Sequence, residues 1–108
     1  MNFSDYQSKA KETAIYPDEF KVTYPALGLA GEAGEIANKV KKILRDDGGH
    51  VTEKRRESLK SELSDCMWYI AALATDLGLN LDDIARDNIE KLASRQERGV
   101  LQGEGDTR

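Results

Sequence analysis

Two stretches of the chain repeat one helical pattern at an offset of thirty residues, and this repeat constrains the fold most strongly. Each stretch has a leucine, an acid three residues later, a second acid after three more, and apolar residues beyond. The matched pairs are Leu29 and Leu59, Glu32 and Glu62, Glu35 and Asp65, Ile36 and Cys66, Val40 and Ile70, and Ile43 and Leu73. Spacings of three and four residues are typical of one helix face. We therefore expect two similar helices.

The repeat also predicts how the two helices pack. Winding them at about 100° per residue places the first acid at the edge of the apolar face and the second roughly 60° further round. A short loop around Gly48-Gly49 separates the stretches, and short loops join antiparallel neighbours. Antiparallel packing would bring the two acid pairs together from opposite helices.

Four neighbouring carboxylates repel each other and raise one another's pKa values unless a cation joins them. Carboxylate oxygens are the ligands that Mg²⁺ prefers. A single Glu-x-x-Glu pair is usually a solvated helix face, but two pairs in register beside apolar stripes favour a metal site. Gly31 and Gly34 lie inside the first pair's helix, at a cost of about 1 kcal/mol each. We expect a close helix approach or room for a ligand to compensate.

The remaining signals predict a single all-α domain over residues 1–108. An N-terminal helix is expected over about residues 4–14, ended by Pro17, so that residues 1–24 form a helix and a loop. The core helices fill residues 25–99, with Pro25 at the first helical position and with Thr52 and Asn80 as N-caps. The tail, residues 100–108, is expected to be irregular, or mobile in isolation, because it contains Gly103 and Gly105.

Composition excludes several classes of protein. A net charge of -4 with 33% charged residues offers no general basic surface for nucleic acid. No stretch approaches the roughly 20 apolar residues of a membrane span, and no signal peptide is present, so a cytoplasmic location is expected. Apolar residues make up 39% of the chain, which is lean for a small free-standing core and favours a partner subunit.

The sequence resembles a known family at Leu29-Ala30-Gly31-Glu32-Ala33-Gly34-Glu35 and at Glu62-Leu63-Ser64-Asp65-Cys66-Met67-Trp68-Tyr69. These motifs are similar to those of the MazG-type nucleotide pyrophosphohydrolases, in the all-α NTP pyrophosphatase superfamily. The resemblance covers about residues 24–99. It implies a four-helix-bundle-like MazG fold, assembled as a dimer or tetramer. It also implies Mg²⁺-dependent hydrolysis, with Mn²⁺ as a substitute, of nucleoside triphosphates to nucleoside monophosphates and pyrophosphate, as in house-cleaning of the nucleotide pool.

The resemblance also implies roles for individual residues. The metal ligands would be Glu32, Glu35, Glu62 and Asp65. Glu32 or Glu35 would take the proton from the attacking water. Asn88, Lys91 and Arg95 match the substrate-binding positions of a later helix in the superfamily. Lys39, one turn beyond Glu35, and Tyr69, one turn beyond Asp65, are further candidates for binding the substrate. Without the family, the basic residues would more often be solvated, and Trp68 and Tyr69 would more often be core or interface aromatics.

Several alternatives are open at this point. Within the superfamily, a dUTPase-like enzyme or a phosphoribosyl-ATP pyrophosphatase uses the same metal chemistry on another base. A non-catalytic helical interaction module would use the charged faces to bind a protein. A di-iron carboxylate protein requires Glu-x-x-His motifs, and the single histidine, His50, belongs to none.

Overall fold

The computed structural model describes residues 1–108 and is entirely helical. The elements are α1 (Phe3–Lys11), a 3₁₀ turn η1 (Asp18–Phe20), α2 (Thr23–Asp46), α3 (Glu53–Asp76) and α4 (Leu81–Glu97). The all-α fold class predicted from the sequence is confirmed. None of these helices combines the length and the apolarity that crossing a membrane requires.

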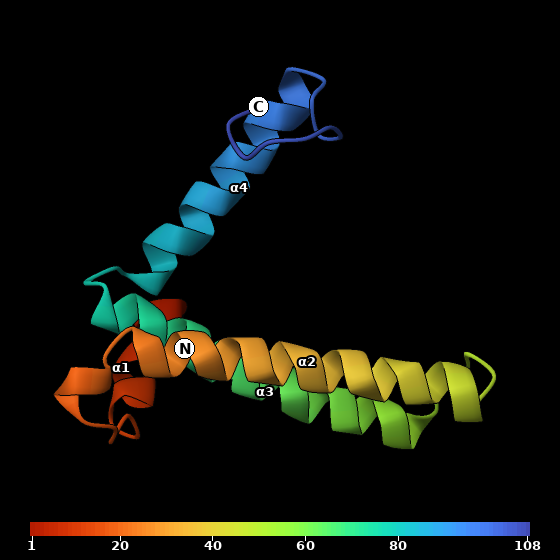
Figure 1. Ribbon diagram of the computed structural model, residues 1–108. Helices are drawn as coiled ribbons and strands as arrows, with labels where there is room; N and C mark the ends of the chain where they lie inside the picture. The colour runs from red at the N-terminus through yellow and green to blue at the C-terminus, as the bar shows by residue number, and fades with distance from the viewer.

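Helices α2 and α3 form a long antiparallel hairpin, with their lengths side by side (Figure 1). The loop between them turns at Gly48 and Gly49, whose φ angles of 61° and 81° favour glycine. Arg55 at the start of α3 donates from Nε to Asp47 Oδ2 at 2.9 Å, which ties the loop to the helix. The predicted antiparallel pairing is therefore confirmed.

The predicted N-caps of α3 and α4 are also confirmed. Thr52 Oγ1 accepts from the Arg55 amide at 3.2 Å, and Asn80 Oδ1 accepts from the Asp82 amide at 2.9 Å. Each cap satisfies amides that have no partner within the helix. Cap signals lie within a few residues of each other along the chain, so they are readable from the sequence.

The N-terminal region differs from the prediction. Helix α1 ends at Lys11, three residues before the expected residue 14, and η1 was not predicted. Helix α2 begins at Thr23, so Pro25 is its third residue rather than its first. A proline is tolerated there because amides of the first turn have no helical partner.

Helix α1 packs against the C-terminal half of α3 and forms a small core with it. Ala10, Ala71 and Leu81 form the buried cluster, and the partly buried Tyr6 and Trp68 pack against it. Only 8 of the 108 residues are buried in the single chain. The apolar area covered by one chain is therefore small, as the lean composition predicted.

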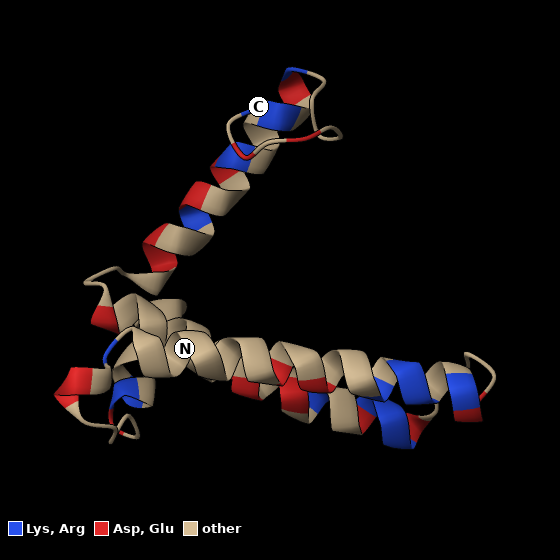
Figure 2. Ribbon diagram, viewed as in Figure 1, with Lys and Arg blue, Asp and Glu red and all other residues tan.

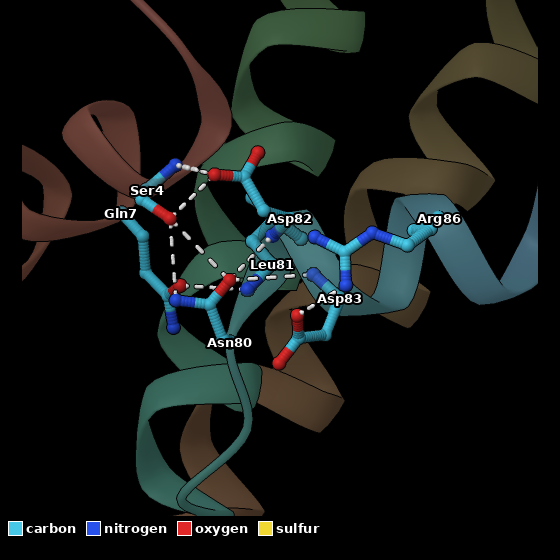
Figure 3. A network of polar contacts seen from close by, with 7 residues as sticks. All are labelled: Ser4, Gln7, Asn80, Leu81, Asp82, Asp83 and Arg86. Carbon is cyan, nitrogen blue, oxygen red and sulfur yellow. Dashed lines mark hydrogen bonds and ion pairs between the residues drawn. The ribbon is translucent and has the colours of Figure 1, made fainter.

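Helix α4 leaves the hairpin instead of packing along it (Figure 1). Its N-terminal end is held on α1 by a network of polar contacts (Figure 3). Asp82 Oδ2 accepts from the Ser4 amide at 3.2 Å, and Gln7 Oε1 accepts from the Leu81 amide at 2.8 Å. Gln7 Nε2 also donates to the Leu79 carbonyl at 2.8 Å. The network sets the direction of α4, so the predicted four-helix bundle is not closed within one chain.

The C-terminal tail is irregular, as predicted, but it is folded back onto α4 (Figure 1). Arg95 and Lys91 both donate to Asp106 Oδ1, at 3.2 Å and 3.1 Å. Arg108 donates from Nη2 to the Leu101 carbonyl at 2.8 Å. The tail covers Arg95, which is buried although it lies near the C-terminal end of α4, away from the other helices.

Candidate metal and phosphate site

Three of the four predicted acids meet between α2 and α3. Glu32 of α2 and Glu62 and Asp65 of α3 each place one carboxylate oxygen within 4.8 Å of the others. Glu32 and Glu62 are half-buried between the helices, and Asp65 is exposed. The thirty-residue repeat therefore converges on one site, because each helix presents its first acid at the edge of the shared apolar contact.

Lys39 is the cation closest to this cluster. Its Nζ lies 2.7 Å from Glu62 Oε1 and 2.7 Å from Ser58 Oγ. Glu62 Oε2, by contrast, is buried and has no hydrogen-bond partner. A buried carboxylate oxygen without a partner costs free energy unless a donor or a metal ion reaches it.

The pKa values of the two half-buried acids move in opposite directions. The hydrogen bond from Lys39 lowers the pKa of Glu62. The pKa of Glu32 is raised, first by the adjacent Glu62 carboxylate, then by burial and by the surrounding carboxylates. When no cation is bound, Glu32 therefore holds a proton more readily than Glu62, because the cluster has more negative charge than Lys39 balances.

These residues fit a hard divalent cation. The donor set is carboxylate oxygen only, which suits Mg²⁺ rather than a softer metal. The unpartnered Glu62 Oε2 supplies an oxygen that the protein itself leaves unused. Glu32, Glu62 and Asp65 are the residues that can hold the ion.

Glu35 lies outside the group of three, although the sequence predicts it as a ligand. It is exposed on α2, one turn beyond Glu32, and it is not among the acids whose oxygens converge. Its position further round the helix turns it toward solvent, while Asp65, its counterpart in the repeat, joins the cluster. The two halves of the repeat are therefore not equivalent in space.

The close contact between α2 and α3 occurs at Gly28, not at the glycines singled out in the sequence. A Cβ atom added at Gly28 would overlap the ring of Tyr69. At Gly31 and Gly34 an added Cβ atom would meet nothing within 4 Å. Of the two alternatives expected for Gly31 and Gly34, the close helix approach is absent, and the open space beside them is consistent with room for a ligand.

Aromatic side chains line the space next to the acids. Glu32, Asp65, Trp68 and Tyr69 line a cavity of about 200 Å³. A neighbouring cavity of about 340 Å³ shares Trp68 and is mostly apolar; it is lined by Thr13, Ile15, Tyr16, Pro17, Phe20, Tyr24 and Trp68. We call Tyr16, Tyr24, Trp68 and Tyr69 the aromatic wall.

The sequence analysis missed the part of the aromatic wall that precedes the first acid pair. Tyr16 and Tyr24 stack with ring centroids 4.6 Å apart, and the rings of Trp68 and Tyr69 meet edge to face at 5.2 Å. The available signal was the spacing of Tyr16, Phe20 and Tyr24, four residues apart in the segment that joins α1 to α2. Trp68 itself packs within the chain, where its Nε1 donates to Thr13 Oγ1 at 2.8 Å.

The predicted substrate residues of α4 do not reach the acids of their own chain. Asn88, Lys91 and Arg95 lie on the helix that diverges from the hairpin (Figure 2). Lys91 and Arg95 bind Asp106 instead, and their hydrogen bonds lower the pKa of that carboxyl. Of the predicted substrate residues, the structure places only Lys39 and Tyr69 beside the acids.

The chain is similar to known proteins over most of its length. Residues 22–100 match the model of the MazG nucleotide pyrophosphohydrolase domain. The chain is also similar to the Gene 37 protein of Mycobacterium phage L5, with 50% identity over 114 residues covering 100% of both chains. No solved structure matches the chain significantly. The all-helical hairpin with its converging acids, together with the match over most of its length, places this chain in the MazG nucleotide pyrophosphohydrolase family.

Proposed function

We propose that the protein is a Mg²⁺-dependent pyrophosphohydrolase that cleaves nucleoside triphosphates between the α- and β-phosphates. The products would be a nucleoside monophosphate and pyrophosphate. The observation that carries this proposal is the cluster of Glu32, Glu62 and Asp65, in which Glu62 Oε2 is buried without a partner. A bound Mg²⁺ or Mn²⁺ would supply charge neutralisation at the phosphates and a more acidic water.

The residues around the cluster have separate tasks in this proposal. Glu32, Glu62 and Asp65 hold the ion, with Glu35 as a further ligand or as the base. Glu35 is exposed and outside the cluster, which leaves its carboxylate able to accept a proton from the attacking water; Glu32 is the alternative base. Lys39 Nζ already lies at the cluster and can bind a phosphate oxygen there.

The aromatic wall is suited to the nucleobase. Tyr69 borders the cavity that contains Glu32 and Asp65, so a base beside it would leave the phosphates at the acids. Flat aromatic rings stack on any base, so the wall fits the class of substrate without selecting one base. A panel of bases is therefore part of the test.

We also infer that the working enzyme is a homo-oligomer. The hairpin exposes large apolar side chains, including Leu44 of α2 at 67% and Leu63 of α3 at 60%. Ile89 on α4 is exposed at 65%, because α4 diverges from the α2–α3 hairpin of its own chain and does not pack along it. Exposed apolar area of this kind marks association surfaces. In a dimer or a tetramer, α4 of one chain would bring Asn88, Lys91 and Arg95 to the acids of another.

The test is pyrophosphate release from a panel of ribo- and deoxyribonucleoside triphosphates with Mg²⁺. Glu62→Gln and Asp65→Asn should each lower kcat/KM by more than about 100-fold, since even residues outside the ligand set are worth about 10- to 100-fold at metal sites. Glu57→Gln is the matched control, because Glu57 is an exposed acid on the same helix. Circular dichroism should show unchanged helicity in all three variants.

The same assay separates the alternatives. Activity confined to deoxyuridine triphosphate, or to a phosphoribosyl nucleotide, would identify the dUTPase-like or the phosphoribosyl-ATP enzyme. Turnover that survives both substitutions would exclude the acid cluster as the site. Absence of turnover on every nucleotide, with Mg²⁺ and Mn²⁺ tested, would leave the non-catalytic interaction module.

A further inference from the structure

Asp76 is the last residue of α3 and lies where a negative charge is unfavourable. The C-terminal end of a helix carries the negative end of its dipole, so an acid there needs compensation. A single oxygen, Asp76 Oδ2, accepts two hydrogen bonds from the segment that joins α1 to α2. The Tyr16 hydroxyl donates to it at 2.7 Å, and the Val22 amide donates to it at 2.9 Å.

Val22 has a backbone conformation that requires support. Its φ angle is 68°, the only positive value at a residue other than glycine. With a ψ angle of -55° it has the rare backbone of a γ-turn with positive φ, which persists at a β-branched residue only where the surroundings hold it. The bond from the Val22 amide to Asp76 is such a constraint. The Val22 carbonyl in turn accepts from the Ala26 amide at 3.0 Å, so this residue starts α2.

The Tyr16 ring connects Asp76 to the candidate site. Tyr16 stacks on Tyr24 at 4.6 Å, and Tyr24 lies 6.4 Å from Tyr69 between ring centroids. Tyr69 borders the cavity that contains Glu32 and Asp65. Burial, and then the hydrogen bond to Asp76, raises the pKa of Tyr16, so its hydroxyl keeps the proton that it donates.

Asp76 itself does not line either cavity of the aromatic wall. It borders another cavity, of about 280 Å³, whose lining includes Lys11, Lys21 and Tyr16. Its influence on a nucleotide at the acids must therefore pass through Tyr16 and through the start of α2. This arrangement separates Asp76 from the metal ligands on the same helix.

We propose that Asp76 is a positioning residue for nucleotide binding, which holds Tyr16 and Val22 so that the aromatic wall stands beside the acid cluster. This inference rests on the proposed function, because it assumes that the base lies against the wall. Asp76 orients the rings that face the base and has no part in the chemical step.

The test compares Asp76→Ala, Asp76→Asn and Tyr16→Phe with Asp87→Ala, an exposed acid of α4 that serves as the control. Asp76→Ala removes both hydrogen bonds and should raise KM for the best nucleotide by about tenfold or more, since one net hydrogen bond is worth up to about tenfold. Its kcat should stay within about twofold of the wild type, because the metal ligands are untouched. Asp76→Asn keeps an acceptor oxygen and should recover most of the wild-type KM.

Tyr16→Phe should raise KM in the same direction, and the double variant Asp76→Ala/Tyr16→Phe should add less than the sum of the two. If Asp76→Ala fails to fold, Tyr16→Phe and Asp76→Asn carry the test. A fall in kcat at unchanged KM, additive effects in the double variant, or an equal effect of Asp87→Ala would overturn the proposal.

Nucleotide binding provides a readout that does not depend on hydrolysis. Trp68 is the single tryptophan of the chain, so quenching of its fluorescence reports a nucleotide beside the wall. If the wild type binds but hydrolyses nothing, the proposed reaction fails while weaker binding by Asp76→Ala still supports the positioning role. If binding to Asp76→Ala equals that of the wild type, the positioning role is excluded whatever the reaction.

Discussion

Lys39 Nζ lies 2.7 Å from one oxygen of Glu62, while the other oxygen of that carboxylate is buried without a partner. The lysine therefore balances part of the charge that α2 and α3 bring together, and it leaves room for a cation to balance the rest. The Glu62 carboxylate therefore has two roles: one oxygen joins α3 to Lys39 of α2, and the other is available as a metal ligand.

Replacing this lysine should make stability depend on the metal. Lys39→Met leaves Glu62 without its donor, which should lower the free energy of unfolding by about 1–2 kcal/mol in EDTA. Mg²⁺ should restore most of the loss by occupying the same carboxylate. Thermal unfolding in EDTA and in Mg²⁺ measures the loss of stability and its recovery. Lys41→Met, at an exposed position of α2, is the control and should leave stability unchanged in both buffers. An equal loss of stability for Lys39→Met in EDTA and in Mg²⁺ would contradict the prediction.

The glycines of α2 should respond to alanine in opposite ways. Gly28→Ala places a Cβ atom in the ring of Tyr69, and we expect a loss of about 1–3 kcal/mol from overpacking. Gly31→Ala meets nothing within 4 Å and should gain up to about 1 kcal/mol from helix propensity. Urea unfolding measures both changes. A stabilised Gly28→Ala variant would show that α2 and α3 do not approach closely at Tyr69.

Mixing two inactive variants should restore activity if α4 serves a partner's site. In a dimer of one Glu62→Gln chain and one Lys91→Ala chain, one of the two sites combines intact acids with an intact lysine. Random mixing makes half of the dimers mixed, so we expect about one quarter of wild-type activity. Pyrophosphate release after the two variants are refolded together measures the restored activity. No recovery in verified mixed dimers would mean that Lys91 acts within its own chain or not at all.

The attachment of the tail to α4 should depend on pH. Hydrogen bonds from Lys91 and Arg95 lower the pKa of Asp106 from its usual value of 3.8. A carboxyl with a depressed pKa contributes to the folded state above its usual pKa and loses that contribution as the pH falls through the lower, folded value. The tail should therefore detach only below about pH 3.8.

An NMR titration of the tail amides measures this detachment. Asp106→Asn is the reference, because it lacks the charge at every pH and its tail amides should show no titration in this range. A wild-type tail that detaches near neutral pH would show that Asp106 does not hold it.

Local signals determined much of this protein. The caps at Thr52 and Asn80, the loop at Gly48-Gly49 and the pairing of Glu32 with Glu62 were all predicted, and each is present. A cap involves amides two or three residues away, and a helical repeat sets its face by spacing alone. Such features depend on few residues at short separations, which is why one sequence is enough to read them.

Contacts across long separations decided the rest. The direction of α4 depends on Ser4 and Gln7, which lie more than seventy residues from their partners Asp82 and Leu81. The place of closest helix contact, Gly28 rather than Gly31, depends on where the Tyr69 ring falls across the hairpin. Spacing within a helix determines which face a residue occupies, but only the packing of helices determines what that face meets. The acids were therefore readable from the sequence, whereas the aromatic wall and the separation of α4 were visible only in the tertiary structure.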